Sequence, residues 1–530
     1  MRLSEAPLLG RLYSDWLGGD PDLNALLSPS LDPAAWERPA SPVADPAALA
    51  GLWAALLEQN RRLGASPEAL ALGERMSKGE ADAVITGQQP ALLGGPLFSL
   101  YKLGTAVALA SRAGQGSARP VAPLFWMVSD DTDFPEIRGA RLPRDLEMLA
   151  AALPDSLHAP HRMVGGLDAA VSHATGAELL DRVGGPHAGF VRRAWDEARG
   201  CARDHGELIA AFLLAALPRW PFLVVDARLP QLRAASTPVF DRYLERRDRV
   251  AGALREGAEW LTTRGHEVRI EERSGEHGLF RVEGDLRRRW EFPDDPAAAR
   301  ADLAALAGAV SANVVLRPLA QDAVLPVLAQ VVGPGEAAYF VQVRRVAHAL
   351  ESRACVLYPR LSASLWPAEA DAVAAAPPVE PAALLTGFDS QLHAHFASMA
   401  APEVRVKLEA FERCLTDHAR GLEESTRALD PSLAQLIESA RGKMDFQVGR
   451  MRDGILSKVK ARHERQHPRL ARLKGFLVPQ EKLQERGMGL AAALAQWGEG
   501  AGDRVLGLAR RHVEDTLAGH PSHYLEPWDG

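Results

Sequence analysis

The sequence has few cysteines, no surplus of basic residues and no long uninterrupted apolar run. Its three cysteines, Cys201, Cys355 and Cys414, lie far apart without CxxC spacing, so neither a disulfide framework nor a thiolate metal site is indicated. The net charge of -7 argues against a whole-chain polyanion binder, because phosphate backbones are held by excess Lys and Arg. No segment approaches the roughly 18 apolar residues of a membrane span, and the beginning of the chain does not resemble a signal peptide. We therefore expect reduced thiols and a cytoplasmic protein that binds neither membranes nor nucleic acid, and no metal site is indicated.

What is present is typical of a large folded protein. Hydrophobic residues make up 47% of the chain and charged residues 24%, which does not fit the composition of disordered proteins. A length of 530 residues predicts about three or four structural units.

Residues 83–136 predict a βαβ unit. A short apolar strand at 83–86 leads through a glycine-containing loop into a helix that opens at Pro96 and stops near Gly114. A continuous apolar run at 121–128 follows, as expected for a strand buried on both faces of a parallel sheet, and ends in an acidic turn at 129–136. Such a unit places the loop and the acidic turn at the carboxyl edge of the sheet, where open α/β sheets bind ligands.

Patterns elsewhere extend this α/β core and interrupt it twice. Buried-strand patterns recur at 222–227, 313–316 and 355–357, whereas 268–270, 279–282 and 289–292 alternate like short antiparallel strands. The predicted segments are an N-terminal helical segment (1–80), the first part of the core (81–140), a helical insertion (141–218), a core strand and helix (219–260), a small β-containing insertion (261–312), the second part of the core (313–375), a coiled-coil hairpin (382–475) and a C-terminal helical segment packed on the core (476–530).

The hairpin is predicted from a heptad pattern. Apolar residues fall at spacings of four, three, four, seven and seven, and Asp430 with Pro431 supplies the start of a second helix. Each arm would be roughly 40 Å long at 1.5 Å per residue. The heptad residues of the first arm are Val404, Leu408, Phe411, Leu415, Leu422 and Leu429.

Three polar groups follow the predicted strands. In the first loop, Thr86, Gln88 and Gln89 precede Gly95 and Pro96, where the helix start offers free amides to an anion and Lys102 adds a charge. The loop matches neither a Walker motif nor G-x-G-x-x-G, so a plain tight turn explains it equally well.

The acidic turn follows a strand that contains Trp126. Asp130, Asp131, Asp133 and Glu136 place four carboxylates within seven positions. A helix cap would use one of them, but mutual repulsion makes four costly unless they meet a cation, an amine or a shared proton. An amino group or Mg²⁺ is the favoured ligand.

The third group begins at Arg317 and Gln321 and continues at Gly335, Glu336 and Tyr339. An exposed arginine and an ordinary helix cap explain it equally well. Near the C-terminus, a polar stretch fits solvated helix surface on spacing alone, as does the basic second arm of the hairpin. That stretch includes Gln484, Glu485 and Arg486.

Taken together and in order, these blocks resemble the cysteine-adding enzyme family of bacillithiol synthesis. The resemblance covers about 400 residues and the hairpin. The matching blocks are TGQQ at 86–89, GPL at 95–97 with YK at 101–102, the run 121–136 with FW at 125–126 and DTDFPE at 131–136, LRPL at 316–319 with Gln321, GPGE at 333–336 with Tyr339, PR at 359–360 and LQER at 483–486.

The resemblance implies an α/β fold with a Rossmann-like core, similar to nucleotidyltransferases and class I tRNA synthetases, with two insertions and a dimerising antiparallel coiled coil. It implies ligation of the cysteine carboxyl to the amine of glucosaminyl malate. Activation by ATP or another adenine nucleotide is expected, although no HIGH signature of the synthetases occurs.

The working hypothesis assigns roles to these residues. Asp131, Asp133 and Glu136 would bind the amine or act as general base, and Arg317 would hold a carboxylate. Thr86, Gln88, Gln89, Gly95, Pro96, Lys102, Trp126, Gln321, Gly335, Glu336 and Tyr339 would bind substrate, and Gln484, Glu485 and Arg486 a nucleotide.

Two alternatives stay open. One is a related ligase that acts on another amine acceptor. The other is a coiled-coil scaffold or nucleic-acid-binding protein that uses the basic hairpin arm.

Overall fold

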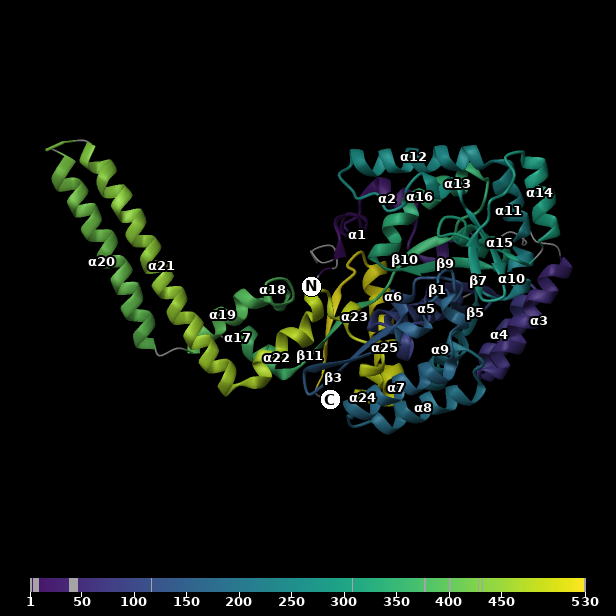
Figure 1. Ribbon diagram of the computed structural model, residues 1–530, viewed down its shortest axis with the longest axis horizontal. Helices are drawn as coiled ribbons and strands as arrows, with labels where there is room; N and C mark the ends of the chain where they lie inside the picture. The colour runs from purple at the N-terminus through teal and green to yellow at the C-terminus, as the bar shows by residue number, and fades with distance from the viewer. Residues whose placement is uncertain are drawn as a thin grey trace.

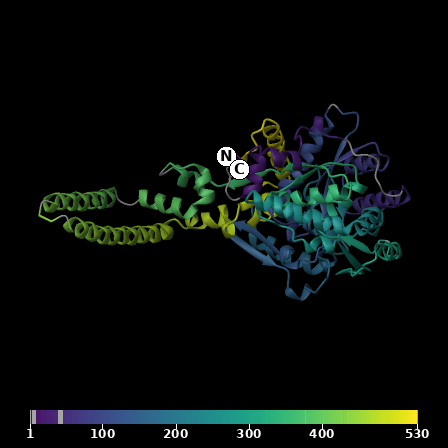
Figure 2. The same ribbon diagram turned by 90° about the horizontal axis from the view of Figure 1, so that it is seen from above.

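The computed structural model describes residues 2, 9–37, 46–115, 117–306, 308–375, 378–399, 402–427, 429–430 and 432–528. A broad body holds most of them, and a pair of long helices projects from it as an arm (Figure 1). Seen from above, the arm extends away from the body (Figure 2). The arm consists of α20 (Pro402–Arg427) and α21 (Ser432–Gln466).

A five-stranded parallel sheet lies at the centre of the body. Its strand order is β10-β9-β1-β2-β5, and every neighbouring pair is parallel. From β1 the chain continues to β2 and β5 on one side and later to β9 and β10 on the other, so the order reverses between β1 and β9. This confirms the predicted Rossmann-like core. The strands are β1 (Asp82–Gln88), β2 (Val121–Met127), β5 (Leu223–Asp226), β9 (Val327–Val332) and β10 (Val356–Pro359).

Helices cover both faces of the sheet because alternate strand residues bury their side chains on opposite sides. Val84 and Phe125 face α5 (Leu97–Gly114), which packs against α25 (Gly500–Leu517). Ile85 faces the N-terminal helices on the other side. These helices include α3 (Pro46–Arg62), whose Leu52, Trp53 and Leu56 are buried, and α4 (Pro67–Ser77), preceded by α1 (Arg11–Leu17) and α2 (Pro21–Leu27).

The prediction of a core strand at 313–316 is wrong. The side-chain oxygen of Asn313 accepts hydrogen bonds from the amides of Val315 and Leu316, and this turn starts α15 (Arg317–Val324). The core strand lies further on, at β9, which is buried along its whole length. Arg317 therefore stands at the start of a helix beside the sheet and not at the end of a strand.

The two insertions flank the carboxyl edge. The first begins with a hairpin that the sequence did not predict, β3 (Gly139–Arg144) and β4 (Glu147–Ala152), and continues with α7 (Ala169–Val183), α8 (Ala188–Cys201) and α9 (His205–Ala216). The second holds an antiparallel sheet of order β7-β6-β8. Residues 268–270 form no strand, contrary to prediction, and the strand expected at 289–292 ends at Arg289. The elements that lie between β5 and α15 in the chain are α10 (Pro230–Ala235), α11 (Thr237–Glu245), α12 (Arg247–Thr263), α13 (Arg273–Glu276), β6 (Leu279–Glu283), β7 (Leu286–Arg289), α14 (Pro296–Ala305) and β8 (Val310–Ala312).

The C-terminal segment returns to the core. Its final strand, β12 (His523–Pro527), pairs in parallel with β11 (Ser362–Trp366). Other helices in the second half of the chain are α16 (Pro334–Ala349) between β9 and β10, α17 (Ala368–Ala375), α18 (Pro381–Thr386), α19 (Phe388–Met399), α22 (Pro468–Leu477), α23 (Gln484–Gly487) and α24 (Ala491–Trp497).

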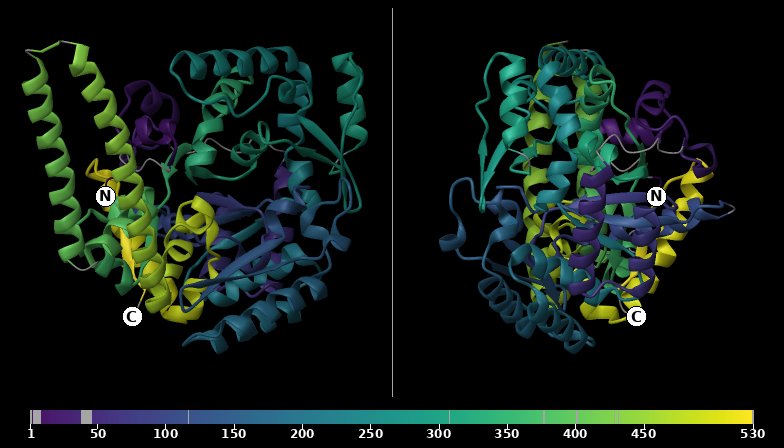
Figure 3. Two further views of the ribbon diagram at one scale, coloured as in Figure 1. Left: turned by 60° about the vertical axis from the view of Figure 1, so that its left-hand side comes forward. Right: turned by 90° about the vertical axis from the view of Figure 1, so that its right-hand side faces the viewer.

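The two helices of the arm lie side by side along their length (Figure 3, left), which confirms the predicted hairpin. Within it, Ala419 and Val448 are buried. Four of the predicted heptad residues, Val404, Phe411, Leu422 and Leu429, are exposed, because the two helices pack through a narrower strip. Pro431, predicted to start the second helix, lies outside the described residues. In the ranges that the structure describes, no helix is both long and apolar enough to cross a membrane.

Candidate functional site

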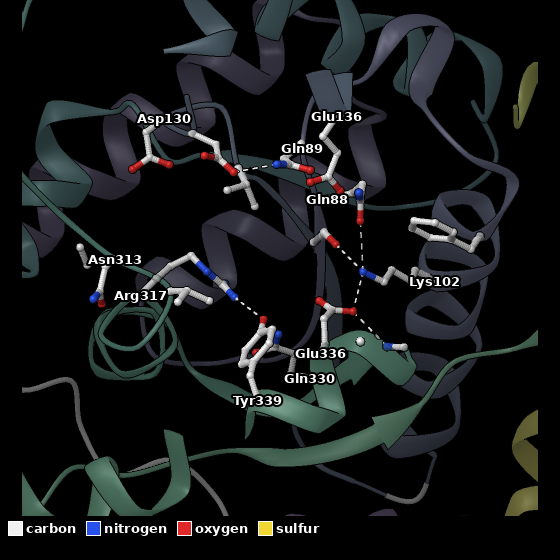
Figure 4. A pocket seen from close by; sticks show the side chains of 18 of the residues that line it. Gln88, Gln89, Lys102, Asp130, Glu136, Asn313, Arg317, Gln330, Glu336 and Tyr339 are labelled. Carbon is white, nitrogen blue, oxygen red and sulfur yellow. Dashed lines mark hydrogen bonds and ion pairs between the residues drawn. The ribbon is translucent and has the colours of Figure 1, made fainter. Parts of the chain in front are cut away.

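A cavity of about 540 Å³, here called the central cavity, opens at the carboxyl ends of β1, β2 and β9. It lies at the point where the strand order reverses, the usual ligand position in open α/β sheets. Figure 4 shows it from close by. Predicted site residues that line it are Gln88, Gln89, Lys102, Asp131, Glu136, Arg317, Gly335, Glu336, Tyr339 and Arg486.

The acidic wall is built from the loop after β1 and the turn after β2. Gln89 Nε2 donates to Asp131 Oδ2 over 2.7 Å, and Asp131 Oδ1 accepts from the amide of Thr132 over 2.7 Å. Glu136 stands at the rim, and partial burial of its carboxylate raises its pKa, while a hydrogen bond with Gln89 lowers it in part. A carboxylate whose pKa is raised is better matched to accepting a proton near neutral pH.

Asp130, beside Asp131, meets the small sheet of the second insertion. Burial raises the pKa of Asp130, and Arg287, whose Nε lies 3.8 Å from Asp130 Oδ2, offsets part of that effect. Arg287 also donates to Ser311 and to the carbonyl of Ala312. The insertion therefore closes one side of the cavity with a fixed cation.

The opposite wall carries Arg317 (Figure 4). Its two amino groups lie 3.4 Å from Gln321 Oε1 and 3.4 Å from the hydroxyl of Tyr339, and its guanidinium lies over the ring of Trp126 at 5.9 Å. Among the described residues, no carboxylate forms an ion pair with Arg317. Burial raises the pKa of Tyr339 to about 12, so its hydroxyl keeps its proton. Arg317 is thus positioned by neutral groups, with its charge left for an anionic ligand.

Lys102 occupies the floor between the walls. Its ammonium donates to the carbonyl of Gly87 over 2.9 Å and to Gln88 Oε1 over 3.3 Å, and lies 2.6 Å from Glu336 Oε2. Burial lowers the pKa of Lys102, and the Glu336 carboxylate offsets only part of that effect. The same carboxylate accepts from the amide of Gly333 over 2.9 Å at the start of α16. Lys102 therefore ties β1, α5 and α16 together.

A buried ion pair supports the far end of the cavity. Arg360 lines the cavity and pairs with Glu485, and both side chains are almost fully buried. Burial alone would raise the pKa of Glu485, but Arg360 and other partners hold that pKa below its usual value. A Cβ on Gly333 would lie 2.9 Å from Arg360 Nε, so only glycine lets this guanidinium pass.

Eight other predicted residues stand outside the lining of the central cavity. Three serve the fold directly: Thr86 donates to the carbonyl of Val331, Asp133 caps α6 (Phe134–Ile137), and Gln321 donates to Gln330. Trp126 lies beneath Arg317. Gln484 bonds the backbone of Leu365 and Phe476, and Glu485 is held by Arg360, so of the predicted nucleotide-binding trio Arg486 alone reaches the cavity.

Gly95 and Pro96 line a neighbouring cleft. The amide of Leu97, the first of α5, already donates to the carbonyl of Met488 over 2.7 Å. A Cβ on Gly94 would meet Leu490 at 2.7 Å. Gly94 therefore serves close packing against the C-terminal segment. At this helix start, where we expected an anion site, the first amide is already occupied.

Sequence reasoning assigned no role to several residues that line the cavity. Gln330 had a readable signal, since it is the one polar residue within the apolar run of β9. Arg360 follows a strand directly, which is also a readable position. Phe98, Arg287 and Asn313 carried no signal, because their places depend on how the insertion and α5 fold over the sheet.

Carboxylates line one wall of the central cavity, and an arginine lines the opposite wall. An amine fits beside Asp131 and Glu136, and a carboxylate fits at Arg317. In the described ranges, no three His, Cys, Asp or Glu side chains converge as a metal site. The chemistry suited to these walls joins an amine to a carboxyl group.

Family comparisons agree with this architecture. Residues 5–361 match the model "Bacillithiol biosynthesis BshC, N-terminal Rossmann-like domain", and residues 378–514 match "Bacillithiol biosynthesis BshC, C-terminal coiled-coil domain".

Curated relatives align along most of the chain. A protein of Koribacter versatilis is 28% identical over 522 residues, 94% of each chain. One from Solibacter usitatus is 27% identical over 515 residues, covering 94% of this chain and 95% of its own. One from Geobacillus kaustophilus is 26% identical over 460 residues, covering 82% and 84%. All three carry the name "Putative cysteine ligase BshC". With both domain models matched in order, the chain belongs to the BshC family of bacillithiol biosynthesis.

Proposed function

We propose that the chain ligates L-cysteine to glucosaminyl malate, forming an amide between the cysteine carboxyl and the glucosamine amine. The observation that carries this proposal is the central cavity, where Glu136 faces Arg317 (Figure 4) and Asp131 lines the same space. The names of the relatives supply the donor, since they are called cysteine ligases.

Each wall has a part in this reaction. Asp131 and Glu136 bind the amine as its ammonium and accept the proton that it must lose before it attacks. Arg317 holds the carboxyl group of cysteine and steadies negative charge on its oxygen as the amide forms. Holding both reactants in one cavity also removes much of the entropy cost of bringing them together.

The carboxyl group needs activation before an amide can form, and we propose ATP or another adenine nucleotide as its source. Arg317 and Arg486 fit this role, because both line the cavity and neither has an ion-pair partner among the described residues. Lys102 fits it less well, since its ammonium is already held by three acceptors.

We also propose that the enzyme acts in the cytoplasm as a homodimer through the arm. Large apolar side chains on the arm are exposed, among them Phe411, Leu422, Leu436 and Phe446. A second copy would cover them.

An acceptor panel tests the proposed reaction. The protein is incubated with cysteine, ATP and either glucosaminyl malate, glucosamine or an unrelated primary amine. The products are separated, and their masses are determined by mass spectrometry. We expect the cysteinyl product chiefly with glucosaminyl malate, together with AMP or ADP. A larger yield with the unrelated amine would favour a ligase for another acceptor.

A further inference from the structure

Two more cavities adjoin the central one. The first, here called the side cleft, measures about 670 Å³ and lies between the start of α5, the β3–β4 hairpin and residues 480–489. The second, here called the rear cleft, measures about 600 Å³ and lies between α1 and the start of α16. Arg486 lines all three cavities, and Glu136 lines both the central cavity and the side cleft.

The side cleft carries positive charge that the protein does not neutralise. Its lining holds four cations and one carboxylate, Glu136. Arg138 is paired with Asp155 at 2.6 Å, but Arg141 donates to the neutral amide oxygen of Gln480 over 2.6 Å. Within the described residues, neither Lys482 nor Arg486 forms an ion pair. Three uncompensated cations therefore face this cleft.

The rear cleft differs in this respect. Arg11 lies 3.5 Å from Asp15, and Arg269 lies 2.7 Å from Glu267. Each of these cations has its own carboxylate, so apart from the shared Arg486 the rear cleft offers less charge to an anion.

Backbone amides at the border of the side cleft are already used. The amides of Leu97, Gly489 and Leu490 donate to the carbonyls of Met488, Arg141 and Gly95. Phosphate sites in proteins commonly use free amides of this kind. The side cleft offers separate side-chain cations instead, which suit a ligand whose negative charges are spread over two carboxylates.

Residues 479–482 are held in a demanding backbone conformation. Gln480 and Glu481 have φ values of 56° and 58°, in the left-handed backbone region that residues other than glycine rarely adopt. The side chain of Gln480 meets Arg141 from this turn. A Cβ on Gly487 would lie 2.6 Å from Pro479, so the turn is packed tightly against the segment that carries Arg486.

We propose that the side cleft binds the acid end of the amine acceptor, with Arg141 and Lys482 opposite the two carboxylates of its malate group. The inference rests on the proposed function, because it assigns the two ends of one substrate. Glu136 connects the two cavities, so an acceptor with its carboxylates in the side cleft presents its amine to Glu136 and Asp131. The cleft thus selects an acceptor that carries an acid group beyond its amine.

Kinetics of Lys482→Gln, Arg141→Gln and the double variant test this assignment. We expect KM for glucosaminyl malate to rise about 5-fold in each single variant and about 20-fold or more in the double variant. KM for cysteine and for ATP should stay at the parent value. Methyl glucosaminide has the amine but no malate. In the variants, the ratio of kcat/KM for glucosaminyl malate to kcat/KM for methyl glucosaminide should fall by the same factor.

Two controls remove one positive charge elsewhere: Lys458→Gln on the exposed arm and Arg269→Gln in the rear cleft. Both should keep the parent KM for glucosaminyl malate. The proposal is overturned if the side-cleft variants keep that KM, if they raise KM for ATP instead, or if Arg269→Gln has the larger effect.

Calorimetric titration with L-malate examines the cleft without turnover. The parent should bind malate and the double variant should bind it at least 10-fold more weakly. Equal binding by both overturns the proposal. If the parent forms no product from glucosaminyl malate, the proposed function fails, and the titration still decides whether the side cleft is a dicarboxylate site.

Discussion

Gln89 Nε2 donates to Asp131 Oδ2 over 2.7 Å and so joins the loop after β1 to the turn after β2. These two segments are 42 positions apart in the chain, and the parallel pairing of β1 with β2 brings their ends together. The bond holds one carboxylate oxygen of Asp131, while the other is held by the turn's own backbone. The orientation of the acidic wall is therefore set by the fold and needs no ligand.

Asp131→Asn should lower kcat about 10²- to 10⁴-fold, the range expected when a positioned general base is lost. The amide keeps the size of the side chain, so the thermal unfolding midpoint should change little. Asp133→Asn is the matched control from the same turn. Because asparagine caps a helix as well as aspartate does, this variant should keep near-parent activity. Equal rates for all three proteins would remove Asp131 from the mechanism.

Arg317→Ala should raise KM for cysteine about 10- to 100-fold, which corresponds to losing a charge-assisted hydrogen bond of about 1.5–3 kcal/mol. The KM of Arg317→Lys for cysteine should lie between those of the parent and Arg317→Ala, since lysine keeps the charge but lacks the planar guanidinium. Steady-state kinetics with cysteine varied measures the effect. Arg300→Ala removes an exposed arginine paired with Asp241 and should leave KM unchanged. A parent-like KM in Arg317→Ala would contradict the assigned carboxylate contact.

Activity should fall on acidification at a higher pH than an ordinary glutamate would give. Burial raises the pKa of Glu136, so its carboxylate picks up a proton earlier as the pH decreases, and the form able to accept the amine's proton is lost. A pH profile of kcat/KM measures this acid limb. In Glu136→Gln the rate should be low throughout and that limb should be absent. An unshifted acid limb in Glu136→Gln would assign the titration to another group.

Glu485→Ala should destabilise the fold by about 3–5 kcal/mol, because it leaves Arg360 buried without its counter-charge. The change is measured as the free energy of unfolding in urea. Glu514→Ala removes a carboxylate that pairs with Arg112 at the surface, and it should change stability by less than about 1 kcal/mol. A stable Glu485→Ala protein with a raised KM for ATP would restore the nucleotide-binding role first expected for this residue.

The parts of the fold that the sequence predicts are those with strong local patterns. β1 and β2 lie in apolar runs bounded by glycine and acidic turns, and the arm follows from its heptads. The core strand at 313–316 was misplaced because the apolar residues after Asn313 suggest a strand, whereas the side chain of Asn313 closes a turn. Local hydrogen bonding by one asparagine outweighed the apolar pattern.

The candidate site was predictable where function and strand ends coincide. Gln89 follows β1 directly, Asp131 and Glu136 lie in the turn and short helix after β2, and all three meet in the cavity. Lys102 was correctly predicted to lie at the site. A single sequence does not show that its ammonium would form an ion pair with Glu336, more than 200 positions later. Arg287 reaches the cavity only because the second insertion folds back over the sheet, a long-range contact without local signal.

The most direct test of the central claim is the mass of the product formed from cysteine, glucosaminyl malate and ATP. The account predicts a product whose mass equals that of cysteine plus glucosaminyl malate less one water, with fragments that place the cysteinyl group on the glucosamine nitrogen. Unchanged substrates under conditions where the protein is folded, or a cysteinyl group attached elsewhere, would contradict it.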